Sequence, residues 1–184
     1  VGGYLRYATG GVAAGLGYES YKFASGKEVE AWTLGGSYRT GDWYFNAGYG
    51  ENKVDPLTSA TDLAVLGAMW QGTINGGFGG SAFLQANKRT IYKVGVGYQL
   101  TPQINLGAHY FHAKQSGTVA TADATANFFT MALDYAFSKR TDAYVEVDNT
   151  RLKGNVSLSS SAAGVGVNGA KSRTGFTVGL RHRF

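Results

Sequence analysis

Polar and apolar residues alternate one by one over long stretches of this chain, and the C-terminal segment 173–184 shows the pattern most clearly. One side of this extended segment carries Phe176, Val178, Leu180, His182 and Phe184, and the other carries Arg173, Gly175, Thr177, Gly179, Arg181 and Arg183. A period of two indicates a β-strand, because successive side chains point to opposite faces. A long strand with one apolar and one basic face fits a wall between lipid and water, which predicts a transmembrane β-barrel.

Eight further segments alternate in the same way, so the sequence predicts nine strands in all. The eight are Val1–Tyr7, Val12–Lys22, Glu30–Arg39, Trp43–Glu51, Thr90–Leu100, Ile104–Lys114, Asn127–Phe137 and Asp142–Leu152. Tight turns and longer polar loops connect them alternately, as in outer-membrane barrels with periplasmic turns and extracellular loops. This order predicts one all-β, antiparallel transmembrane β-barrel domain over 1–184, with its C-terminus on the periplasmic side.

The predicted strand number is odd, whereas single-chain bacterial barrels have an even number of strands. An open sheet edge is unstable in lipid, because its backbone N–H and C=O groups lack partners. Two weak strand candidates within the long connection, Asp62–Trp70 and Ser81–Asn87, would still leave the number odd. We therefore expect the N-terminal strands of the barrel to be absent from this sequence.

Aromatic residues recur near both ends of the apolar strand faces. Four strands carry two of them six positions apart, which corresponds to roughly 15 Å of height at ~3.3 Å per residue and ~40° of tilt. The predicted membrane-girdle residues are Tyr18, Trp32, Tyr38, Trp43, Tyr49, Tyr92, Tyr98, Tyr110, Phe129, Tyr135, Phe137 and Phe176. Aromatic residues are also good strand formers, but that preference alone would not sort them into two belts.

The opposite strand faces are rich in glycine and small polar residues, which predicts a wide, water-filled lumen; alternatively, the glycines let the wall bend and let rings pack over them. The charged residues predicted to line the pore are Arg6, Glu19, Arg39, Lys93, Asp134, Glu146, Asp148, Arg173, Arg181 and Arg183. Six cations against four anions give a mild excess that favours anions. Pairing of Arg181 and Arg183 with Glu146 and Asp148 would cancel much of this excess positive charge.

Composition narrows the class of protein further. Charged residues make up 16 % of the chain, and there are 28 glycines and no cysteine, against about 25 % charged residues in average proteins. Without cysteine there is no disulfide framework or thiolate metal site. The net charge of +5 comes from basic residues scattered singly along the strands, which does not favour nucleic-acid binding.

The sequence does not predict an enzyme. Its histidines are His109, His112 and His182, and no serine or carboxylate stands at a recognisable motif spacing from them. Alternation puts His109 and His112 on opposite faces of one strand, so they cannot hold a metal ion together. We therefore expect no catalytic, cofactor or metal site.

Two C-terminal segments, YAFSKRTDAYVEVD at 135–148 and VGLRHRF at 178–184, resemble the last strands of general diffusion porins, with Neisseria- and Burkholderia-type proteins as the nearest group. Two further segments, 46–53 and 105–110, are similar to earlier strands of these porins. The resemblance implies a 16-stranded homotrimeric barrel in the Gram-negative outer membrane, of which this chain holds strands eight to sixteen. It also implies that the constriction loop lies in the absent half and that the barrel-assembly machinery reads the terminal Phe184.

The expected function is therefore passive diffusion of small hydrophilic solutes and ions through a channel surrounded by outer-membrane lipid. One alternative is a smaller barrel that acts as an adhesin or structural anchor through the long loops 52–89 and 153–171. Another is a soluble lipocalin-like carrier, which would require the aromatic-rich strand faces to be buried.

Overall fold

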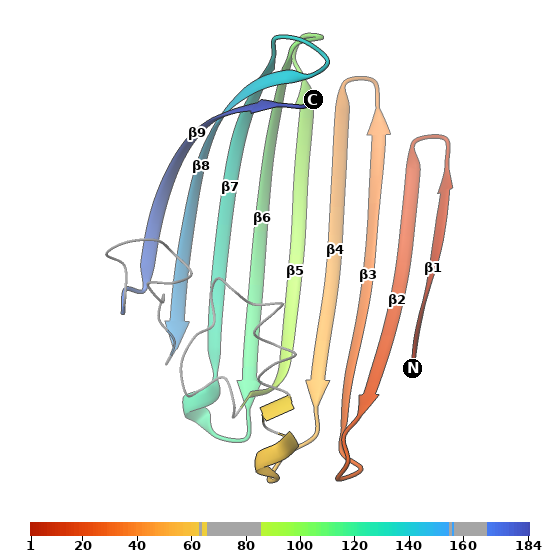
Figure 1. Cartoon of the computed structure of the whole chain (residues 1–184), viewed down its shortest axis with the longest axis vertical. Helices are drawn as coiled ribbons and strands as arrows, with labels where there is room; N and C mark the ends of the chain where they lie inside the picture. The colour runs from red at the N-terminus through yellow and green to blue at the C-terminus, as the bar shows by residue number, and fades with distance from the viewer. Residues whose placement is uncertain (63, 66–85, 155, 157–168) are drawn as a thin grey trace.

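The computed structural model describes residues 1–62, 64–65, 86–154, 156 and 169–184. Its nine antiparallel strands form one sheet in which neighbours in the sequence are neighbours in space (Figure 1). The strands are β1 (Gly2–Thr9), β2 (Val12–Lys22), β3 (Glu28–Thr40), β4 (Trp43–Val54), β5 (Ala86–Gln99), β6 (Ile104–Gly117), β7 (Ala124–Ala136), β8 (Thr141–Gly154) and β9 (Ser172–His182). The predicted all-β fold and its nine strands are confirmed. The sheet is open, because β1 and β9 are not paired with each other.

Several strands are longer than predicted at the ends that lead into the loops. β4 continues to Val54, β6 continues to Gly117, and β5 begins at Ala86. At these ends both faces of the strand carry polar residues, so the alternation fades while the backbone ladder continues. The strand candidate Asp62–Trp70 is wrong where it is described, because residues 60–62 and 64–65 are helical. In Ser81–Asn87, residues 86 and 87 belong to β5, and the remainder lies outside the described residues.

The two kinds of connection lie at opposite ends of the sheet. The tight turns between β1 and β2, β3 and β4, β5 and β6, and β7 and β8 share one end, which also holds the C-terminus (Figure 1). The longer connections share the other end, where a short 3-10 helix, η1 (Ala120–Ala122), precedes β7. The sheet thus has a turn end and a loop end, as the alternation of connection lengths predicted.

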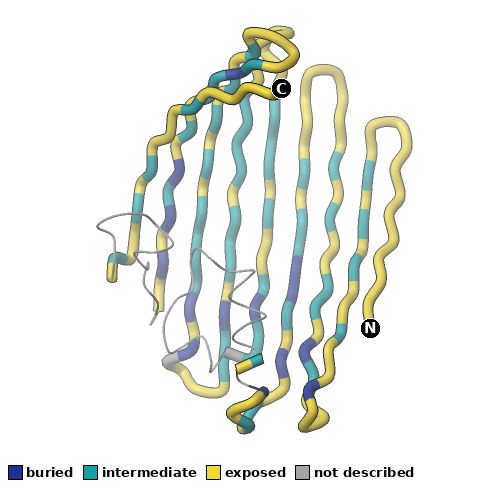
Figure 2. The backbone as a smooth tube through the Cα atoms, viewed as in Figure 1, coloured by how far each residue is buried: buried dark blue, intermediate teal, exposed yellow. Residues whose placement is uncertain are grey.

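Buried apolar residues in the described part of the chain gather at the loop end of the sheet (Figure 2). One cluster contains Phe23, Val29 and Val54, and another contains Ala124, Leu152 and Val156. The middle of the sheet has no such core, because the large apolar side chains there stay exposed. A soluble protein would bury this surface, since exposed apolar area costs about 25 cal/mol per Å² in water.

Gly11, in the turn between β1 and β2, occupies a position that other residues fit poorly. Its φ is +87°, and a Cβ atom there would lie 2.5 Å from the Arg39 carbonyl oxygen. The approach is close because the Arg39 amide donates a hydrogen bond to the Gly11 carbonyl at 2.8 Å. The neighbouring Gly10 also has positive φ, but no atom lies within 4 Å of its Cβ position.

We therefore expect Gly11→Ala to lower the free energy of unfolding by about 1–3 kcal/mol, through backbone strain together with the clash. Gly10→Ala shares the strain but not the clash, so its loss should be smaller. Urea unfolding of the protein reconstituted in lipid vesicles measures both variants. Equal losses of unfolding free energy at the two positions would show that the close contact with the Arg39 carbonyl oxygen does not affect stability.

Candidate channel wall

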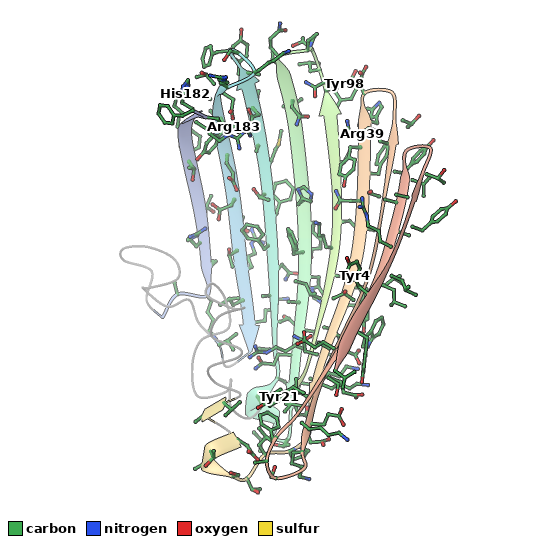
Figure 3. The ribbon with its side chains drawn as sticks, turned by 45° about the vertical axis from the view of Figure 1, so that its right-hand side comes forward. Tyr4, Tyr21, Arg39, Tyr98, His182 and Arg183 are labelled. Atoms are coloured by element: carbon green, nitrogen blue, oxygen red, sulfur yellow. The ribbon has the colours of Figure 1, made fainter. Side chains whose placement is uncertain are left out.

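The pairing register determines which side chains share a face, because residues directly opposite each other in antiparallel strands point to the same side. It puts nine of the ten charged residues predicted to line a pore on one side of the sheet, which we call the polar face. The nine are Arg6, Glu19, Arg39, Lys93, Asp134, Glu146, Asp148, Arg173 and Arg181. The tenth, Arg183, follows the end of β9, where its amide donates a hydrogen bond to the Arg140 carbonyl. Figure 3 shows side chains projecting from the single layer, with Arg39 and Arg183 labelled.

Two charged residues of the polar face were missed by the sequence analysis. Asp142 lies opposite Arg181 in the register, and Arg89 lies opposite Gln115. Asp142 and Arg89 therefore belong to the polar face. Arg89 was assigned to a loop because β5 begins earlier than the alternation indicates. Asp142 was placed in a strand, but no sequence signal showed that it would bind a partner.

Carboxylates at the C-terminal side of the polar face bind arginines of the last strand. Arg181 donates two hydrogen bonds to the two carboxylate oxygens of Asp142, at 2.9 and 2.7 Å. Arg173 forms an ion pair with Asp148. The prediction that Arg181 pairs with Glu146 or Asp148 is therefore wrong: β9 is in register with Asp142 opposite Arg181. Glu146 instead accepts a hydrogen bond from the Thr130 hydroxyl at 2.7 Å.

The polar face of β3 to β6 has a different charge balance. It carries Arg39, Arg89 and Lys93, and among its described residues there is no aspartate or glutamate. The ion pairs found in the described part of the chain involve neither Arg39 nor Lys93. The Arg39 guanidinium lies 5.5 Å from the centre of the Tyr44 ring, which does not neutralise its charge. This part of the wall is therefore positively charged.

An open hollow of about 620 Å³ lies over the polar face of β1 to β5 and extends to Phe111 of β6. Its floor includes Gly15, Gly35 and Gly48, which are in register with one another, and Arg6 and Lys93 flank this row of glycines. A Cβ atom at any of the three glycines would meet only backbone oxygen, at 3.6 Å. No side chain covers the glycines, so the floor of the hollow is bare backbone between two cations.

The opposite side of the sheet, which we call the apolar face, carries the predicted girdle residues. Rings near the loop end contact one another from strand to strand: Trp32 and Tyr49 lie 4.8 Å apart between ring centres, and Tyr49 and Tyr92 lie 4.9 Å apart. Near the turn end, Trp43 lies 4.5 Å from Tyr98. Between these rows, apolar side chains are 38–70 % exposed, namely Leu16, Leu34, Phe45, Val94, Met131, Leu133, Val145, Val147, Val178 and Leu180.

The histidines lie on the faces that alternation predicted. His109 is on the polar face, where its Nε2 atom is 3.3 Å from the Asn46 amide nitrogen. His112 is on the apolar face, with its Nδ1 atom 2.8 Å from the Asn127 side-chain oxygen. Within the described ranges, no group of three or more histidines and carboxylates could hold a metal ion. No helix in the same ranges is long and apolar enough to cross a membrane.

Solved structures match this fold over nearly the whole chain. An anion-selective porin from Comamonas acidovorans aligns with a TM-score of 0.70 and 24 % identity, covering 100 % of this chain and 48 % of the porin. OmpT, an outer membrane protein of Vibrio cholerae, aligns in its trimer form with a TM-score of 0.64 and 16 % identity, covering 97 % of this chain and 54 % of OmpT. At these identities the likeness concerns the fold. The chain spans about half the length of the structures it matches.

A sequence comparison with curated proteins gives no match. The sequence profile of the family described as Gram-negative porin, in contrast, matches residues 1–155, which is most of the chain. With its single antiparallel sheet and its apolar face, the chain therefore belongs to the Gram-negative porin family, an all-β family of the outer membrane.

Proposed function

We propose that the nine strands form part of the wall of a closed barrel that lets small hydrophilic solutes and ions diffuse passively across the outer membrane. The observation that supports this most directly is the pairing register, which leaves the apolar face without charged side chains between the two aromatic belts and puts the predicted pore-lining charges of the strands on the other face. The apolar face meets lipid between two aromatic belts, and the polar face meets water. Closure needs further strands, because the outer edges of β1 and β9 would lack backbone partners in lipid.

A barrel wall of this kind also implies an orientation in the membrane and an assembly of several copies. The turn end of the sheet, with the C-terminus, faces the periplasm, because outer-membrane barrels place short turns there. The trimer form of OmpT supports a trimer for this protein as well. The exposed Phe184, whose ring lies 4.9 Å from His182, is the residue that the barrel-assembly machinery would read.

We further propose that the channel prefers anions. The ion pairs Asp142–Arg181 and Asp148–Arg173 neutralise charge on β8 and β9. Arg39 on β3 and Lys93 on β5 take part in none of the ion pairs of the described residues, so the positive potential of the wall is concentrated there. Charges that line a pore set its selectivity. The match to a porin described as anion-selective supports the same preference.

Planar-bilayer recordings of the full-length protein under a KCl gradient test this proposal. We expect an open channel with a reversal potential of the sign given by chloride permeation. Lys93→Gln should lower the ratio of anion to cation permeability about twofold, because a unit charge at about 16 Å in water contributes roughly 0.25 kcal/mol, favourable for an anion and unfavourable for a cation.

Lys114 provides a matched control, because it is an exposed lysine on β6 that points to the apolar face. Lys114→Gln should leave the reversal potential unchanged. Preference for K⁺ in the unmodified channel would contradict anion selectivity, and absence of conductance would contradict the channel itself.

A further inference from the structure

We propose that the wall of this channel binds small carboxylates that carry an aromatic ring, at a site formed by Ile91, Lys93 and Phe111, which line the glycine-floored hollow, and the adjoining Phe128. This inference rests on the proposed function, because the ligand would reach the site through a water-filled lumen. It adds a substrate class to the anion preference.

Apolar side chains lie on the polar face at a place where a water-filled lumen would favour polar ones. Ile91 of β5, Phe111 of β6 and Phe128 of β7 all point to the polar face. Phe111 and Phe128 are direct partners across β6 and β7, with ring centres 5.8 Å apart, and Ile91 is 44 % exposed. Apolar side chains grouped on a water-facing surface are typical of binding sites.

The second observation is a positive charge that adjoins the apolar surface. Lys93 is in register with Phe111, and its Nζ atom lies 5.8 Å from the centre of that ring. None of the ion pairs in the described residues includes Lys93. A neutral aliphatic solute would gain nothing from this ammonium group, and an inorganic anion would gain nothing from the rings. A ligand that uses both has an anionic group joined to an apolar body.

The third observation concerns the shape of the ligand. Gly48 lies opposite Lys93 on β4, and a Cβ atom at Gly48 would meet only the Leu34 carbonyl oxygen. The backbone beside Lys93 is therefore bare, and glycine in a strand often marks a place where a ligand approaches closely. A flat ring can lie against this backbone next to Phe111 while its carboxylate faces Lys93. The geometry thus favours an aromatic body over a branched aliphatic one.

Phe111 and Phe128 also stabilise the pairing of β6 and β7, since cross-strand aromatic pairs contribute to sheet stability. If that were their whole role, removing one ring would change stability and leave permeation of every anion unaltered. Measurement of binding separates the two possibilities.

The test uses the full-length protein in planar bilayers, with benzoate as the probe and gluconate as a polar carboxylate of greater size. Benzoate added to KCl should reduce the chloride current in a saturable way, and gluconate should not. Phe111→Ala should weaken the apparent affinity for benzoate about three- to tenfold, the range expected for one aromatic contact. It should leave the ratio of chloride to potassium permeability unchanged. Lys93→Gln should lower both quantities.

Phe129→Ala provides the matched control, because Phe129 is the next residue of β7 and points to the apolar face. That variant should bind benzoate as the unmodified channel does. Phe111→Leu, which keeps an apolar side chain without a ring, replaces Phe111→Ala if the alanine variant does not fold.

Two results would overturn the site while the channel stands: equal inhibition by benzoate and gluconate, or unchanged benzoate affinity in both Phe111 variants. Absence of conductance, or preference for K⁺, would instead remove the proposed function, and the site with it.

Discussion

Arginine in place of Met131 should lower the free energy of unfolding of the membrane-embedded protein by about 2–4 kcal/mol, the cost of a cation at the lipid midplane of a barrel. Met131 is 49 % exposed on the apolar face, midway along β7 between Phe129 and Tyr135. The guanidinium would have to reach water past one of the aromatic belts. Reversible urea unfolding of the full-length protein in phospholipid vesicles measures the loss.

Ala132→Arg is the matched control for this prediction. Ala132 is the next residue of β7, and it lies on the polar face opposite Glu146. Arginine there would meet water and a carboxylate, so the stability should change by less than about 1 kcal/mol. A comparable loss at both positions would mean that the two faces of the sheet do not separate lipid from water.

The double variant Asp142→Asn, Asp148→Asn should raise the ratio of anion to cation permeability about fourfold. Each aspartate neutralises an arginine of β9. Asparagine keeps the size of the side chain and one oxygen acceptor while removing the charge. If each charge changes the permeability ratio about twofold, as for a group at about 16 Å in water, two changes multiply to about fourfold. Reversal potentials under a KCl gradient measure the change.

Glu51→Gln serves as the control, because Glu51 forms ion pairs with Lys53 and Lys88 on the apolar face. Removing its charge should not alter selectivity. Combining Lys93→Gln with the double aspartate variant should bring the ratio of anion to cation permeability part of the way back to the value of the unmodified channel. If the aspartate variants leave selectivity unchanged, the β8–β9 part of the wall does not contribute to the field along the permeation path.

The β8–β9 part of the wall and the part formed by the strands before it therefore have different roles. On β8 and β9, carboxylates and arginines pair across strands, so that part stabilises the wall more than it attracts ions. On β3 to β5, Arg39 and Lys93 lie beside glycine and aromatic residues and take part in none of the ion pairs of the described residues. A permeating anion would therefore be attracted chiefly to the N-terminal part of the sheet, where the hollow lies.

Alternation along the chain was sufficient to predict nine strands, their order of turns and loops, and the face of the nine singled-out charged residues that lie within strands. The reason is physical: a strand in a wall between lipid and water has one apolar and one polar side, and side chains alternate with a period of two. The pattern failed where that difference vanishes. At the loop ends of β4, β5 and β6 both sides are polar, so strand ends were placed too early or too late and Arg89 was missed.

The tertiary structure decided which groups meet. Asp142 rather than Glu146 binds Arg181, because the register of β8 and β9 places Asp142 directly opposite Arg181 and Glu146 opposite Thr177. Lys93, Phe111 and Phe128 lie on three different strands, and the sequence alone does not show how these strands are aligned with one another. A sequence determines what each strand presents to lipid and to water. Only the pairing of strands determines which charges cancel and which side chains form a site, because those distances depend on the alignment of one strand against the next.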